Sequence, residues 1–80
     1  MTDQTIIEKI TEIVRDELED DSIVLTPETQ AKEVPGWDSL AHVRIVIGVE
    51  TAFGLRFDTN EITGLGNVGD LVALVEREHS

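Results

Sequence analysis

The sequence has no cysteine and few basic residues, and each shortage excludes a class of function. Without cysteine the chain has no disulfide framework, no thiolate metal site and no thiol nucleophile. Six lysine and arginine residues stand against seventeen aspartate and glutamate residues, which gives a formal net charge of -11. Nucleic acids and anionic membranes are polyanions that such a chain repels, so we expect neither as a partner.

Long apolar runs are also missing. The longest run is only a few residues, far short of the roughly 20 that span a membrane. No basic region followed by an apolar stretch opens the sequence, so we expect no signal segment. The 80 residues are 40% hydrophobic, which suffices for one small core. We therefore expect a single domain over residues 1–80, and its high charge and lack of targeting signals favour a cytoplasmic monomer.

Three stretches have apolar residues at the three- and four-residue spacing of helices, and the second stretch carries them on more than one side. The first runs from Asp3 to Leu18. The second is predicted to begin at Asp38-Ser39, both of them good N-caps, and to end before Gly54. The last follows the capping residues Asn67 and Asp70. Its buried face is expected to hold Val68, Leu71, Val72 and Val75.

A short helix and a long loop complete the predicted fold. Residues 58–61 fit a capping box and predict a short helix that ends at Gly64. Residues 19–37 show no period, so we expect a loop with one short turn. Four apolar residues are candidates to anchor this loop to the core: Ile23, Leu25, Val34 and Trp37. The fold class is therefore all-α, a four-helix bundle of three longer helices and one short helix with a long first loop.

Metal sites and nucleophilic catalysis fit the sequence poorly. Residues 19–21 are acidic but lack the alternating ligands of a calcium loop, and His42 and His79 have no ligand-spaced partner. Asp38, Ser39 and His42 are the residue types of a catalytic triad, yet on one helix they lack the walls and oxyanion hole of an active site. The glycines at 64, 66 and 69 are spaced too loosely for a phosphate loop. We expect no metal and no enzyme activity.

The remaining candidate is Ser39. Asp38 already supplies a cap, which leaves Ser39 redundant in that role. Val43 and Ile47 continue its side of the helix with apolar surface that a four-helix core does not need. A serine that is only an N-cap, in an acidic helical adaptor whose apolar strip binds a partner, stays as the alternative.

The segment Gly36-Trp37-Asp38-Ser39-Leu40 resembles the Asp-Ser-Leu attachment motif of acyl carrier proteins, the phosphopantetheine-binding domains of fatty acid, polyketide and related pathways. The similarity extends to the length, the acidity, the long first loop and residues 49–54. It implies that a separate phosphopantetheinyl transferase attaches 4'-phosphopantetheine from coenzyme A to Ser39 through a phosphodiester. It also implies that the thiol of this arm holds an acyl or aminoacyl group as a thioester. Enzymes that load and transfer acyl or aminoacyl groups are then the other partners.

The resemblance also suggests where partners and cargo bind. Candidates for the motif and partner contacts are Trp37, Asp38, Leu40, Val43, Arg44 and Ile47. Candidates for a cleft that shelters the acyl chain are Val43, Ile47, Ile62, Leu65 and Val68, with ordinary core the stronger expectation at Ile62 and Leu65. In many family members the second helix is acidic, but residues 39–53 contain only Arg44 and Glu50, and we expect His42 and Arg44 on its exposed flank. This neutrality and Trp37 favour a freestanding, specialised carrier with dedicated partners.

Overall fold

The structure, a computed structural model, describes residues 3–63 and 65–79, and the side chains of all of these except residues 3, 59 and 79. The elements in chain order are α1 (Asp3–Leu18), the 3₁₀ turn η1 (Ala31–Glu33), α2 (Ser39–Phe53), α3 (Thr59–Thr63) and α4 (Val68–His79). No strand occurs in these residues. The predicted all-α fold with three longer helices and one short helix is therefore confirmed.

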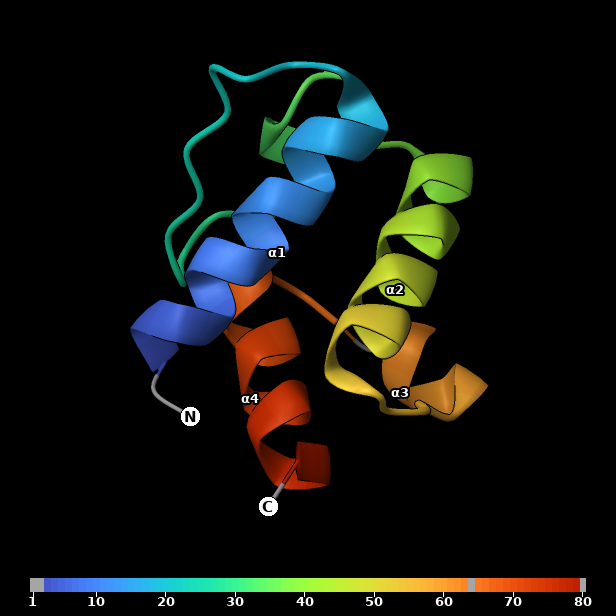
Figure 1. The fold of residues 1–80 in the computed structure, drawn as a ribbon. Helices are drawn as coiled ribbons and strands as arrows, with labels where there is room; N and C mark the ends of the chain where they lie inside the picture. The colour runs from blue at the N-terminus through green and yellow to red at the C-terminus, as the bar shows by residue number, and fades with distance from the viewer. Residues whose placement is uncertain (1–2, 64, 80) are drawn as a thin grey trace.

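The core lies where α1 packs against α2 and α4 (Figure 1). α1 contributes a stripe spaced by four residues, Ile6, Ile10 and Val14, each with no exposed surface. α2 and α4 supply the facing apolar residues: Ala41, Ile45, Val49, Val68, Leu71, Val72 and Val75. These residues lie on the predicted face of α4 and on one of the apolar sides of α2.

The long loop between α1 and α2 is fixed to the bundle by side chains and by backbone. Its four predicted anchors are all buried: Ile23, Leu25, Val34 and Trp37. The backbone N–H groups of Val68 and Gly69 donate to the carbonyls of Thr29 and Pro27, both at 2.8 Å. A Cβ on Gly69 would lie 2.9 Å from the Pro27 oxygen, so glycine permits this contact. The loop is therefore tied to the start of α4.

The helix boundaries follow local capping chemistry. Asn67 Oδ1 accepts from the Asp70 N–H at 2.9 Å, while Asp70 Oδ2 accepts from the Asn67 N–H at 3.3 Å, which confirms the predicted cap of α4. α3 begins at the predicted capping box, where the Asp58 N–H donates to Glu61 Oε1 at 3.1 Å. Glu61 also pairs with Arg77 of α4, which holds α3 against the end of that helix. The predicted end of α3 at Gly64 lies outside the described residues.

Candidate functional site

The start of α2 is capped by Asp38. Its Oδ1 accepts from the Ala41 N–H at 2.9 Å, and its carbonyl accepts from the His42 N–H at 2.8 Å. Ser39 is therefore the first residue of the helix and not its N-cap. The alternative in which Ser39 serves only as an N-cap is wrong on this point, because Asp38 performs that role.

Ser39 places its hydroxyl oxygen at this end of the helix. The residue is exposed, and its side chain makes no hydrogen bond within the part of the chain that the structure describes. The first N–H groups of a helix lack acceptors within it, and with the helix dipole they favour negative charge nearby. A phosphate ester at this hydroxyl would therefore lie in a favourable field.

Ser39 lies on the rim of an open groove of about 820 Å³, which we call the Ser39 groove. It runs between the start of α2, the turn η1 and the chain around α3. Its lining residues are Ala31, Lys32, Trp37, Asp38, Ser39, His42, Val43, Ile62, Thr63 and Leu65. Three of the five predicted cleft residues, Val43, Ile62 and Leu65, thus lie together beside Ser39.

The other two predicted cleft residues lie elsewhere. Val68 is only 2% exposed and lines a cavity behind the groove. Ile47 lines a separate groove with Glu50, Leu55 and Arg56. The five residues therefore do not share one groove, because one further turn of α2 carries Ile47 past the Ser39 groove to the residues that follow the helix.

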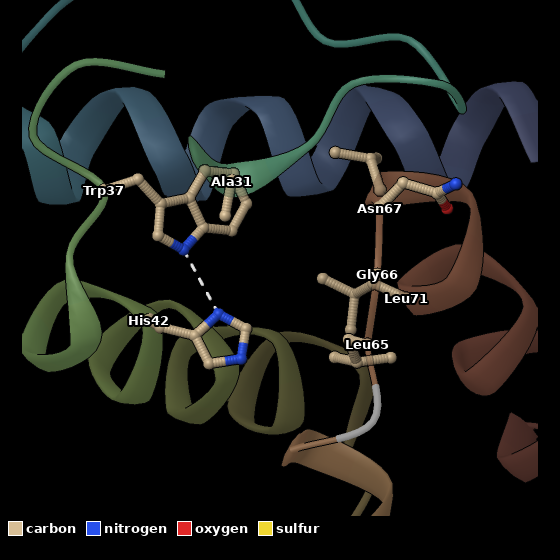
Figure 2. Close-up of a pocket in the computed structure, with 8 residues that line it drawn as sticks. Ala31, Trp37, His42, Leu65, Gly66, Asn67 and Leu71 are labelled. Carbon is tan, nitrogen blue, oxygen red and sulfur yellow. Dashed lines mark hydrogen bonds between the residues drawn. The ribbon is translucent and has the colours of Figure 1, made fainter. Parts of the chain in front are cut away.

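The cavity behind the groove, which we call the inner cavity, has about 20 Å³ of space, room for one water molecule. Figure 2 shows Trp37 and His42 facing each other on one side of it, with Leu65, Gly66 and Leu71 on the other. Val68 and Leu71 form its deep end and are each 2% exposed. As it stands, this space holds no acyl chain.

Trp37 and His42 are held together in the wall of this cavity. The indole N–H of Trp37 donates to His42 Nδ1 at 3.2 Å, and the rings stack with centroids 6.1 Å apart. The expectation of an exposed flank is wrong for His42, which is half-buried between Trp37 and α3. Trp37 is only 9% exposed, as expected for a loop residue that anchors on the core, and its side chain offers little surface to a partner.

The outer face of α2 is apolar and largely uncharged. Leu40, Val43 and Ile47 are 61%, 51% and 55% exposed, as expected for a surface that contacts a partner. Arg44 is exposed as predicted, and its Nη1 lies 3.5 Å from Oε1 of Glu17 on α1. The Arg44 charge is therefore balanced from within the chain.

None of the helices in the described residues has both the length and the apolar character needed to cross a membrane. Across the same residues, no group of three histidine, aspartate or glutamate side chains is placed to hold a metal ion. The side chain of His79, one of the two histidines considered as metal ligands, lies outside them.

Comparison with known proteins identifies the family. The family model for the phosphopantetheine attachment site matches residues 8–75. The chain belongs to the acyl carrier protein family. A similar solved structure is the solution NMR structure of a holo acyl carrier protein from Geobacter metallireducens, with 40% sequence identity and a TM-score of 0.83. The match covers 90% of this chain and 83% of that one.

The cofactor of this acyl carrier protein is a covalently attached 4'-phosphopantetheine. The residues at the start of α2 fit such a group, because they offer an exposed hydroxyl, a helix N-terminus and an open groove beside both. The site also has parts that the sequence did not reveal. Lys32 and Thr63 line the groove from a loop and from the end of a short helix, where no periodic pattern indicates which way a side chain faces. Nothing in the spacing of His42 indicates that it lines the groove beside Trp37.

Proposed function

We propose that Ser39 is the attachment site of the 4'-phosphopantetheine arm, and that this acyl carrier protein holds acyl or aminoacyl groups on that arm as thioesters. The observation that supports this proposal is that Asp38 and Ser39 have separate roles at the start of α2. Asp38 takes the capping role, which leaves the Ser39 hydroxyl exposed on the rim of an apolar groove. A serine that was needed for the cap would have its oxygen occupied by a backbone N–H.

The attachment step requires little of this chain beyond an accessible hydroxyl. The Ser39 oxygen forms a bond to the phosphorus that carries the pantetheine arm. The bond from that phosphorus to the second phosphate of coenzyme A breaks, and adenosine 3',5'-bisphosphate leaves with the electron pair. The hydroxyl proton passes to a base on the transferase. A separate transferase therefore explains why no base among the described residues lies within hydrogen-bond distance of the Ser39 hydroxyl.

The arm supplies a terminal thiol, to which cargo is joined as a thioester. The residues of this chain position the arm and present it. Asp38 fixes the first turn of α2, so the Ser39 oxygen has a defined place relative to the groove. The tether raises the local concentration of cargo at any enzyme that docks nearby. In this proposal residues 1–80 act as one non-catalytic carrier domain, monomeric and cytoplasmic.

The exposed face of α2 is the proposed contact surface for the transferase and for the enzymes that load and transfer cargo. Its apolar residues Leu40, Val43 and Ile47 lie on the same side of the helix as Ser39. Arg44 beside them is already paired with Glu17. Such a face favours dedicated partners with apolar docking sites over partners that read a strongly acidic helix. Arg44→Glu makes α2 acidic, as in many family members, and should slow transfer by the native partner enzymes. Unchanged transfer would count against dedicated partners with apolar docking sites.

A thioester test addresses the carrier function itself. The protein is incubated with octanoyl-coenzyme A and a broad-specificity phosphopantetheinyl transferase, and its intact mass is read before and after hydroxylamine. We expect a mass increase of one octanoyl arm, followed by loss of the octanoyl group alone, because hydroxylamine cleaves thioesters and spares phosphodiesters. An octanoyl group that survives hydroxylamine would contradict the thioester.

A further inference from the structure

The Ser39 groove and the inner cavity adjoin, and they share part of their lining. Four residues line both spaces: Ala31, Trp37, His42 and Leu65. On the outer side of these residues lies the Ser39 hydroxyl. On the inner side lie Val68 and Leu71, both 2% exposed and part of the core. An acyl chain that starts from Ser39 can therefore reach the interior here only by passing the shared residues.

Two of the four shared residues, Trp37 and His42, form a bonded pair, which we call the ring wall. The Trp37 N–H donates to His42 Nδ1 at 3.2 Å, which makes Nδ1 the acceptor and leaves Nε2 as the ring nitrogen that can donate. Nε2 lies 3.5 Å from the carbonyl oxygen of Ile62 in α3. One tautomer thus satisfies both contacts, and the imidazole is held between the loop that precedes α2 and the short helix α3. Figure 2 shows the two rings with the hydrogen bond between them.

We propose that the ring wall keeps the cargo in the Ser39 groove and out of the bundle, so that this protein carries acyl groups too short or too polar to gain from burial in a core. This inference rests on the proposed function of Ser39. The inner cavity, about 20 Å³, has no room for an alkyl chain. The groove is far larger, and its rim includes the polar groups of Lys32, Asp38 and Thr63. A long alkyl chain left there would keep much of its surface in water, at a cost that grows with its length.

The test compares short and long cargo on the same protein. Acetyl and octanoyl arms are loaded from their coenzyme A esters, and the methyl signals of Val68 and Leu71 are followed by NMR. Changes between the two cargoes are expected at Val43 and Ile62, in the groove, and absent at Val68 and Leu71. Shifts of the Val68 and Leu71 methyls with octanoyl on the native chain would overturn the proposal. Intact mass is read first, because a failure to load contradicts Ser39 as the attachment site, whereas interior shifts contradict the ring wall alone.

His42→Ala tests whether the ring wall is the barrier. This change removes the imidazole from the boundary between groove and cavity, so octanoyl is expected to shift the Val68 and Leu71 methyls in the variant. Thr63→Ala is the matched control, because Thr63 lines the groove but not the inner cavity. It should leave the interior methyls unshifted. Interior methyls that stay unshifted in a folded His42→Ala protein would overturn the role of the wall.

A second variant covers the case in which His42→Ala does not fold. Trp37→Phe keeps an aromatic ring in the core, but it removes the indole N–H that donates to His42 together with the volume of the second ring. Octanoyl is then expected to shift the Val68 and Leu71 methyls, since nothing holds the two rings together. Val68 and Leu71 methyl signals that stay unshifted in a folded Trp37→Phe protein would also contradict a wall maintained by the Trp37–His42 bond.

Discussion

Asp38 and Ala41 are joined across the first turn of α2 by a 2.9 Å hydrogen bond, in which the Ala41 N–H donates to the Asp38 carboxylate. This bond assigns the capping role to Asp38 and not to Ser39. The cap stabilises the helix, and the next residue keeps its oxygen free.

Because Asp38 is the cap, substitutions at Asp38 and at Ser39 should differ in their effect on the free energy of unfolding. Asp38→Ala should lower the free energy of unfolding by about 0.5–2 kcal/mol, because the Ala41 N–H loses its acceptor. Asp38→Asn keeps an acceptor at that place and should cost far less. Ser39→Ala should leave stability nearly unchanged, since the Ser39 side chain bonds no described residue. Urea unfolding followed by circular dichroism measures all three, and a large loss for Ser39→Ala would contradict the assignment of the cap.

The ends of α1 and α2 provide a second pair of predictions. Glu19 (φ 53°) and Gly54 (φ 67°) are both left-handed, and the residue after each donates its N–H to the carbonyl five residues earlier. A side chain in this conformation costs roughly 1–2 kcal/mol, which glycine avoids. Glu19→Gly should therefore stabilise the protein by about 0.5–1 kcal/mol, after the extra backbone entropy that glycine loses.

The acidic charge of Glu19 needs its own control. Five acids lie between Asp16 and Asp21, so removing one also relieves repulsion. Glu19→Gln removes the charge and keeps the side chain, and it should stabilise less than Glu19→Gly. Gly54→Glu, the reverse exchange at the end of α2, should destabilise. Equal melting temperatures for Glu19→Gly and Glu19→Gln would show that the backbone conformation contributes nothing.

Asp20 should titrate at unusually low pH. The hydroxyl and the backbone N–H of Ser22 both donate to its Oδ1, and they hold its pKa below the ordinary value of 3.8. Because the folded pKa is depressed, this contribution to stability is present above pH 3.8 and is lost as the pH falls through the folded pKa. Ser22→Ala should raise the pKa of Asp20 toward 3.8, as followed by carboxyl NMR titration. An unchanged titration would contradict the hydroxyl contact.

The outer face of α2 predicts how partners respond to salt and to substitution. Ile47→Asp places a charge on a side chain that is 55% exposed, so it should raise the KM of the transferase without unfolding the protein. Val24→Asp is the matched control, the same kind of exchange at a 74% exposed valine on the first loop. It should leave KM unchanged.

The KM of the transferase should also depend only weakly on salt, because residues 39–53 carry one arginine and one glutamate.

Most of the fold could be predicted because its signals are local. The stripe Ile6, Ile10 and Val14 has the period of a helix, and Asp38 and Asn67 are capping residues directly before apolar segments. The attachment residue could be predicted for the same reason, since a short motif carries it. The 3₁₀ turn at residues 31–33 has no comparable period, so the sequence indicated a short turn in the loop without its place.

The walls of the site could not be predicted, because they depend on residues distant in sequence. The burial of His42 requires Trp37 to turn inward from the loop and the Ile62 carbonyl, twenty residues later, to lie against its other nitrogen. Val43 and Ile47 share one helix face, yet different neighbours place them in different grooves. A helical period shows which side chains point the same way. It does not show which other elements cover them.

The most direct test of the central claim is the site of attachment. The native chain, Ser39→Ala and Ser22→Ala are each incubated with coenzyme A and a broad-specificity phosphopantetheinyl transferase, and their intact masses are compared. Ser22 is an exposed serine of the first loop, distant in sequence from the attachment motif. We expect one added arm on the native chain and on Ser22→Ala, and none on Ser39→Ala. An arm on Ser39→Ala, or none on the native chain with several transferases, would contradict it.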